Sequence, residues 1–113
     1  MLYTNLYHLE NALDLERTIL QHEKVLIVCG RMGLQCVTIY RIAEALEKEY
    51  KEVRFCDLEY DNPESKIVCE SLNMHTFSNL PFTLYYFKGK VVKATSGIQT
   101  KEQIEKNINE YFQ

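Results

Sequence analysis

The feature that most constrains the fold is the segment 24–29, in which a continuous apolar and mostly β-branched run follows Lys24. A short run of this kind is typical of a strand that is covered on both faces. A connection at 30–33 with a glycine at each end follows, and then a segment at 34–50 whose apolar residues recur every three or four positions, which predicts an amphipathic helix. Residues 53–60 are a second apolar strand candidate. This strand–helix–strand order predicts a parallel pair at the centre of a sheet.

Helix caps and turn residues mark the borders of the other elements. The side chain of Asn11 can accept from free backbone N–H groups at a helix start, and Thr100 with Gln103 forms a capping-box pattern. Pro63 suits the first turn of a helix, and Lys88-Gly89 separates two strands closely enough for a hairpin. The sequence thus predicts an α/β fold with a central mixed sheet of four to five strands and about four helices. The expected strands are 2–9 (edge), 24–29, 53–60, 82–87 and 90–95; the expected helices are 12–22, 34–50, 64–72 and one from 100 onward, with a loop at 73–79.

Composition excludes several classes of function. A chain of 113 residues fits one domain, 1–113, with a sizeable core. The net charge of −3, without a basic run, argues against a nucleic-acid partner. No apolar stretch is long enough for a membrane span, and residues 1–8 lack the pattern of a secretory signal. Four cysteines without a Cys-x-x-Cys pair, and three scattered histidines, predict reduced thiols in the cytoplasm and neither a metal nor a cofactor.

Four short motifs follow one another in an order that resembles thioredoxin. The segment 25–36 lines up without gaps on that family's strand, active-site loop and helix start, with Cys36 on the second cysteine of the family's Cys-Gly-Pro-Cys motif. Asp61-Asn62-Pro63 matches the family's Asp/Glu-Asn-Pro turn, and Leu80-Pro81 matches its Ile-Pro step, whose proline is cis. Ser96-Gly97 matches the small residue and glycine that line the same groove. The resemblance covers residues 6–112 and implies the thioredoxin fold.

The departures from that family concern its sulfur chemistry. The family's first cysteine lies at a helix N-terminus, where backbone N–H groups and the helix dipole stabilise a thiolate. That thiolate attacks a disulfide, and the second cysteine resolves the mixed disulfide. Here Gly33 replaces the nucleophile, so the first step cannot begin at this position, although glycine remains an acceptable N-cap. In addition, Leu34-Gln35 replaces Gly-Pro, Ile27 replaces the buried aspartate that handles the proton of the second cysteine, and Met32 and Cys29 replace two tryptophans.

Three roles for Cys36 are compatible with the sequence. It can be a buried thiol that acts as a small apolar group, which we favour. It can be a surviving nucleophile whose mixed disulfides nothing at position 33 could resolve. It can also pair with Cys29 across the loop, if the strict geometry of a disulfide is met. Cys56 and Cys69 are expected in the core, His75 in a solvated loop, and His8 and His22 have no partner visible in the sequence.

The resemblance also implies a groove that recognition could use after catalysis is lost. In the family, the backbone beside the cis-proline pairs with an extended segment of a partner protein. The groove residues expected here are Met32, Leu34, Gln35, Leu80, Pro81 and Gly97. Two functions therefore stay open, and we favour the first. One is a module that binds an extended or cysteine-bearing segment of a protein or peptide; the other is a monothiol or rearranged-dithiol oxidoreductase that uses Cys36, with or without Cys29.

Overall fold

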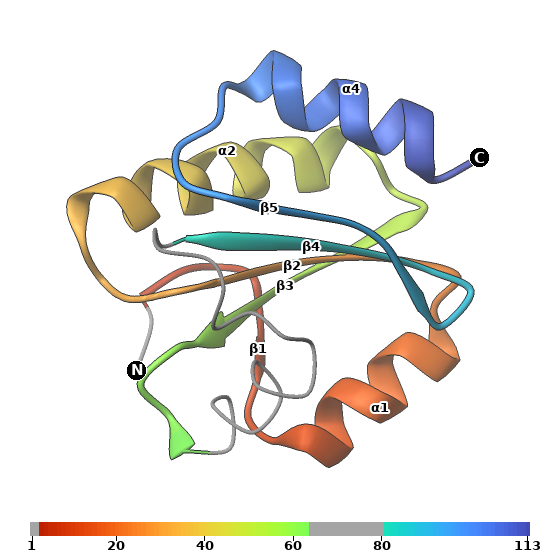
Figure 1. Cartoon of the computed structure of the whole chain (residues 1–113), viewed down its shortest axis with the longest axis horizontal. Coiled ribbons are helices and arrows are strands. Elements are labelled where there is room, and N and C mark those ends of the chain that lie inside the picture. Colours follow the sequence, from red (N-terminus) through yellow and green to blue (C-terminus); the bar gives the residue numbers. More distant parts are fainter. Residues whose placement is uncertain (1–2, 64–80) are drawn as a thin grey trace.

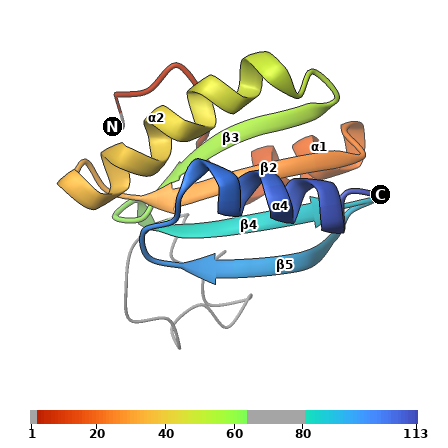
Figure 2. The ribbon, with the colours of Figure 1, turned by 90° about the horizontal axis from the view of Figure 1, so that it is seen from above.

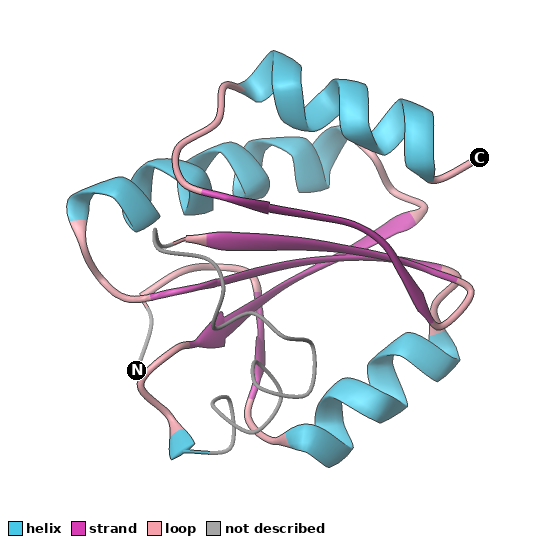
Figure 3. Cartoon of the chain, viewed as in Figure 1, coloured by secondary structure: helices cyan, strands magenta, loops and turns pink. Residues whose placement is uncertain are grey.

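A computed structural model describes residues 3–63 and 81–113 of the chain (Figures 1 and 3). In these residues five strands and three helices follow one another in the order that the sequence predicts. The helix expected at 64–72 and the loop expected at 73–79 lie outside the described residues, as do Cys69, His75 and Leu80. The elements are β1 (Tyr7–Leu9), α1 (Ala12–Gln21), β2 (Lys24–Gly30), α2 (Leu34–Glu49), β3 (Val53–Glu59), β4 (Phe82–Phe87), β5 (Lys90–Ser96) and α4 (Lys101–Tyr111).

The strands form one mixed sheet in the order β1-β3-β2-β4-β5. β3 runs parallel to both β1 and β2, whereas β4 is antiparallel to β2 and to β5. The predicted parallel pair and the predicted hairpin are therefore confirmed. β2 lies at the centre, and six of its seven residues are buried, which agrees with the prediction of a strand covered on both faces.

Helices cover both faces of this sheet. α2 and α4 lie on one face and α1 lies on the other (Figure 1), and Figure 2 shows α2 and α4 side by side over the strands. Side chains of β2 alternate between the two layers, because successive residues of a strand point to opposite faces. Leu26 and Val28 belong to the core cluster under α2 and α4, whereas Ile27 and Cys29 belong to the cluster on the α1 side.

The predicted caps and turn are confirmed in their atomic contacts. The Asn11 side chain accepts from the backbone N–H of Asp14 at 2.8 Å, and Thr100 and Gln103 form a complete capping box. Lys88 and Gly89, with φ of 53° and 83°, make the two-residue turn of the β4–β5 hairpin. Lys88 has to adopt the left-handed backbone that most L-residues avoid, because the twist of the hairpin requires it.

The ends of several elements differ from the prediction. The first strand begins at Tyr7 and not at residue 2, because backbone and side-chain groups of Thr4 and Asn5 bond to side chains of β3 and α2 instead of to a neighbouring strand. His22 and Tyr50 are C-caps that follow α1 and α2, and not helical residues. Within the described residues, no helix is long and apolar enough to cross a bilayer, and no cluster of three or more His, Cys, Asp or Glu side chains could hold a metal ion.

Candidate functional site

The loop at 30–33 and Pro81, which the sequence assigns to the groove, lie at one end of the sheet, whereas Leu80 is outside the described residues. Cys29 of β2 is opposite Phe82 of β4, so the loop that follows Gly30 and the Pro81 that precedes β4 leave the sheet at the same end. The backbone N–H of Gly97 donates to the carbonyl oxygen of Pro81 at 2.9 Å. Gly97 has a φ of 85°, a backbone conformation that favours glycine.

Gly33 is the N-cap of α2, at the position where the resemblance places the family's first cysteine. It is exposed, its φ and ψ of −99° and 163° are accessible to any residue, and no side chain caps the helix. A Cβ built at Gly33 would have nothing within 4 Å. The helix start is therefore intact, but the residue there has no group that can react.

Cys36 lies in the first turn of α2 and is closed off from solvent. Its exposed fraction is 4%, and the backbone N–H of Arg31 lies 3.5 Å from its sulfur. A Cβ added to Gly30 would lie 2.8 Å from Cys36 Sγ and 2.8 Å from the Tyr40 hydroxyl oxygen. The thiol thus fills the space that the absent side chain of Gly30 leaves.

The structure does not bring Cys29 and Cys36 together. Cys29 is fully buried in the core cluster on the α1 side of the sheet, and Cys36 packs in the cluster under α2. A bridge between them would have to pass through the plane of the sheet. Cys56 is in the core as predicted, and burial raises its pKa to about 12, so this thiol stays protonated.

Exposed apolar residues are the chain neighbours of Gly33 and Gly97. Leu34 is 87% exposed and Met32 is 40% exposed, and Ile98, which follows Gly97, is 58% exposed. Gln35 is exposed beside them on the first turn of α2. We call Met32, Leu34 and Ile98 the apolar rim. Ile98 was not among the residues predicted from the sequence; its place directly after the groove glycine was the available signal.

Arg31 ties the loop to its surroundings through both backbone and side chain. Its carbonyl oxygen accepts from the Tyr40 hydroxyl at 3.0 Å. Its Nε donates to the Asp61 carboxylate, with the two oxygens at 2.8 and 3.1 Å, and its guanidinium carbon lies 5.1 Å from the centre of the Tyr60 ring. The backbone N–H of Tyr60 donates in turn to the carbonyl oxygen of Gly30 at 2.9 Å. The loop is therefore held on two sides.

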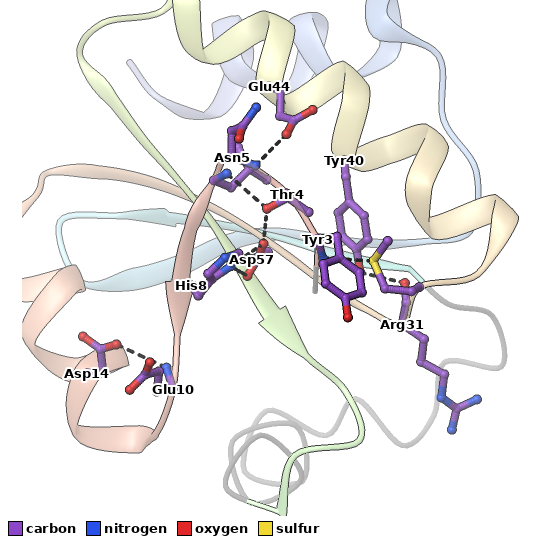
Figure 4. Close-up of polar contacts among 12 residues, drawn as sticks. Tyr3, Thr4, Asn5, His8, Glu10, Asp14, Arg31, Tyr40, Glu44 and Asp57 are labelled. Atoms are coloured by element: carbon purple, nitrogen blue, oxygen red, sulfur yellow. Dashed lines mark hydrogen bonds and ion pairs between the residues drawn. The ribbon is translucent and has the colours of Figure 1, made fainter. Parts of the chain in front are cut away.

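A buried carboxylate on β3 anchors the segment that precedes β1 (Figure 4). Asp57 is 1% exposed, accepts from the Thr4 hydroxyl, and lies 2.7 and 2.9 Å through its two oxygens from His8 Nδ1. The backbone N–H of Asn5 donates to the Glu44 carboxylate of α2 at 2.6 Å. The backbone nitrogen of Tyr3 lies 3.3 Å from Met32 Sδ. This segment therefore connects the sheet edge to the apolar rim.

The sequence alone shows no partner for His8 and does not mark Asp57 as a functional residue, yet the two side chains are in contact. The available signal was a charged residue inside the apolar run of β3, a position where an ion needs a partner. Burial raises the pKa of Asp57, and the Thr4 and His8 contacts counteract part of that rise. Ile27, at the place of the family's aspartate, is fully buried on the opposite face of the sheet from this cluster.

Comparison with known proteins identifies the fold. No known family matches the sequence, and no curated protein matches it. Among solved structures, thioredoxin from Plasmodium falciparum is similar over 94% of this chain and 99% of its own, with 20% identity and a TM-score of 0.79. Mitochondrial thioredoxin 3 from Saccharomyces cerevisiae matches over 93% and 94% of the two chains, with 20% identity and a TM-score of 0.79. Thioredoxin from Fasciola hepatica matches over 94% and 99%, with 24% identity and a TM-score of 0.78. The chain therefore has the thioredoxin fold, as the motifs implied.

The close packing at Gly30 predicts a local intolerance of side chains. We expect Gly30→Ala to lower the free energy of unfolding by about 1–3 kcal/mol, because its methyl group would overlap Cys36 Sγ and the Tyr40 hydroxyl. Urea unfolding measures the change. Gly33→Ala is the matched control and should change stability by less than about 1 kcal/mol, since nothing lies near its Cβ. A Cys36→Ala background should reduce the cost of Gly30→Ala. Equal effects at the two glycines would contradict this account.

The buried carboxylate predicts a pH dependence of defined sign. The folded-state pKa of Asp57 is raised, so the folded protein binds this proton more tightly than the unfolded chain does. Stability should therefore fall as the pH rises from the ordinary aspartate range through the folded-state pKa, and then stay level. Asp57→Asn should remove this fall. Urea unfolding from pH 3.5 to 8 measures the free energy of unfolding of the wild type and of Asp57→Asn, each also in a His8→Gln background. If the wild type becomes more stable relative to Asp57→Asn as the pH rises, the predicted sign is wrong.

Proposed function

We propose that this chain binds an extended segment of a partner protein in the groove at Gly33, Pro81 and Gly97, in a thiol-redox context, and does not reduce disulfides. The observation that carries the proposal is an intact helix start at Gly33, where the reactive side chain is missing, beside a thiol at Cys36 that is 4% exposed. The helix start is formed as in a reactive site, but residue 33 carries no sulfur. The four cysteines without a Cys-x-x-Cys pair favour a cytoplasmic protein.

The burial of Cys36 argues against turnover by this thiol. Disulfide exchange needs a thiolate that can approach the sulfur of its substrate. Cys36 Sγ faces Gly30 and Tyr40 inside the core, and a substrate disulfide could come within its reach only if α2 or the loop moved away. The alternative function, an oxidoreductase that uses Cys36 with or without Cys29, would need such a movement and a second thiol on the same face of the sheet.

The apolar rim supports binding. A side chain that is 87% exposed, such as Leu34, gains free energy when a partner covers it. Met32 adds a flexible and polarizable surface that can adapt to different side chains. Pro81 has no N–H, but its carbonyl oxygen, which the Gly97 N–H holds in place, has a second lone pair that can serve as an acceptor at the edge beside this surface. An extended chain can use such an edge for main-chain hydrogen bonds, and the rim for side-chain contacts.

The proposal predicts that selected peptides bind at the rim. A displayed library of ten-residue peptides is selected for binding to the wild-type protein. Each peptide has a serine at its centre, where a redox partner would have a cysteine, and is random at the other positions. The tightest are then titrated into ¹⁵N-labelled protein. We expect amide shifts at 31–36 and at Gly97 and Ile98. Leu34→Asp should weaken binding about tenfold or more, because it removes apolar contact and adds a charge that must be desolvated.

Leu20→Asp is the matched control, since Leu20 is 75% exposed on α1, on the other face of the sheet. It should leave the affinity unchanged. Selection that enriches no peptide, or peptides whose binding responds equally to the two substitutions, would show that the groove is not a binding site.

A further inference from the structure

Arg31 has hydrogen-bonding capacity that the described parts of the chain do not use. A guanidinium group has five N–H donors, one on Nε and four on the two terminal nitrogens. Both contacts with Asp61 are made by Nε. Within residues 3–63 and 81–113, the terminal nitrogens make no hydrogen bond, and 54% of the side chain is exposed. In Figure 4 the Arg31 side chain points away from the cluster around Asp57.

This guanidinium is also held in a fixed orientation. The Tyr60 ring supports one face at 5.1 Å, and the Asp61 carboxylate holds Nε. The backbone of Arg31 is fixed in turn by the Tyr40 hydroxyl and by Cys36 Sγ. Because the side chain is already ordered, a ligand that binds it loses little further conformational entropy. Two other exposed cations of the described residues lie elsewhere and carry flexible side chains. Lys88 is in the β4–β5 turn near Glu23, and Lys101 is paired with Glu49 at the C-terminal end of α2.

The position of Arg31 connects these donors to the proposed groove. Arg31 precedes Met32 of the apolar rim, and it is the only charged residue between Gly30 and Cys36. A carboxylate can accept two parallel hydrogen bonds from a guanidinium fork, a geometry that a lysine ammonium cannot offer. Among residues 3–63 and 81–113, Asp61 is the one carboxylate that contacts Arg31; its side chain is 53% exposed, and it bonds Nε and not the terminal nitrogens.

We propose that Arg31 is a specificity residue of the groove and selects partner segments that carry an aspartate or glutamate beside their apolar residues. The inference rests on the proposed function, because it requires a segment bound at the rim. It adds a charge requirement that an apolar rim alone does not have. An acidic side chain of the segment accepts from the terminal nitrogens of Arg31, while neighbouring apolar side chains cover Met32 and Leu34.

The test uses the peptides selected on the wild-type protein. Selection should enrich aspartate or glutamate at one position of the peptide. A selected peptide is then synthesised with glutamate and with glutamine at that position, and each affinity is measured by calorimetry. We expect the glutamate peptide to bind about three- to fivefold more tightly, the range of a well-oriented exposed ion pair, and the preference to shrink at high salt.

Variants identify the partner of that carboxylate. Arg31→Gln should abolish the preference for glutamate while the glutamine peptide binds as before, and Arg31→Lys should retain only part of it. Arg41→Gln is the matched control, because Arg41 is 58% exposed and is paired with Glu44 at 2.8 Å on α2. It should preserve the preference in full. Peptides that bind the rim with no difference between glutamate and glutamine, or a preference that survives Arg31→Gln, would overturn this inference alone. Enrichment of no peptide would overturn the proposed function, and this inference with it.

Discussion

The close approach between the end of β2 and the first two turns of α2 determines the rest of the site. Gly30 has no side chain, and the space beside it is filled by the sulfur of Cys36 and the hydroxyl of Tyr40. The same contact fixes the start of α2, since the Tyr40 hydroxyl also donates to the carbonyl oxygen of Arg31. It buries the thiol of Cys36 in the first turn of α2, and it leaves the N-cap at Gly33 facing solvent. A site that would otherwise expose a thiol therefore presents backbone and apolar side chains.

Contacts from two other parts of the chain hold this loop in place. Tyr60 and Asp61, which follow β3, support the guanidinium of Arg31. The segment before β1 reaches Met32 through the backbone of Tyr3, and its hold on the sheet depends on the buried Asp57 carboxylate. A surface that is ordered before binding loses less entropy when a partner binds, which favours the binding function proposed above. Binding without turnover is thus compatible with the geometry of the whole end of the sheet.

Much of the fold could be predicted from the sequence, because hydrophobic periodicity and caps are local. The buried run of β2, the amphipathic α2, the Asn11 cap and the Lys88-Gly89 turn were all visible in the sequence. The limits of β1 were not, since they depend on bonds from Thr4 and Asn5 to Asp57 and Glu44, far along the chain. Likewise, the sequence does not show that Cys29 and Cys36 lie on opposite faces of the sheet, because this depends on how β2 pairs with its neighbours and on where α2 packs. The roles of Arg31 and Asp57 depend on partners that only the folded chain brings together.

The central claim is that position 33 holds the fold of a reactive site without its chemistry. Insulin reduction coupled to dithiothreitol tests this most directly, with wild type, Cys36→Ser and Gly33→Cys measured side by side. We predict that the wild type and Cys36→Ser do not accelerate the reaction above the dithiothreitol background. Gly33→Cys should accelerate it, because the backbone at position 33 accepts a side chain without contact and the helix N-terminus would stabilise the new thiolate. Wild-type turnover that Cys36→Ser abolishes would contradict the account.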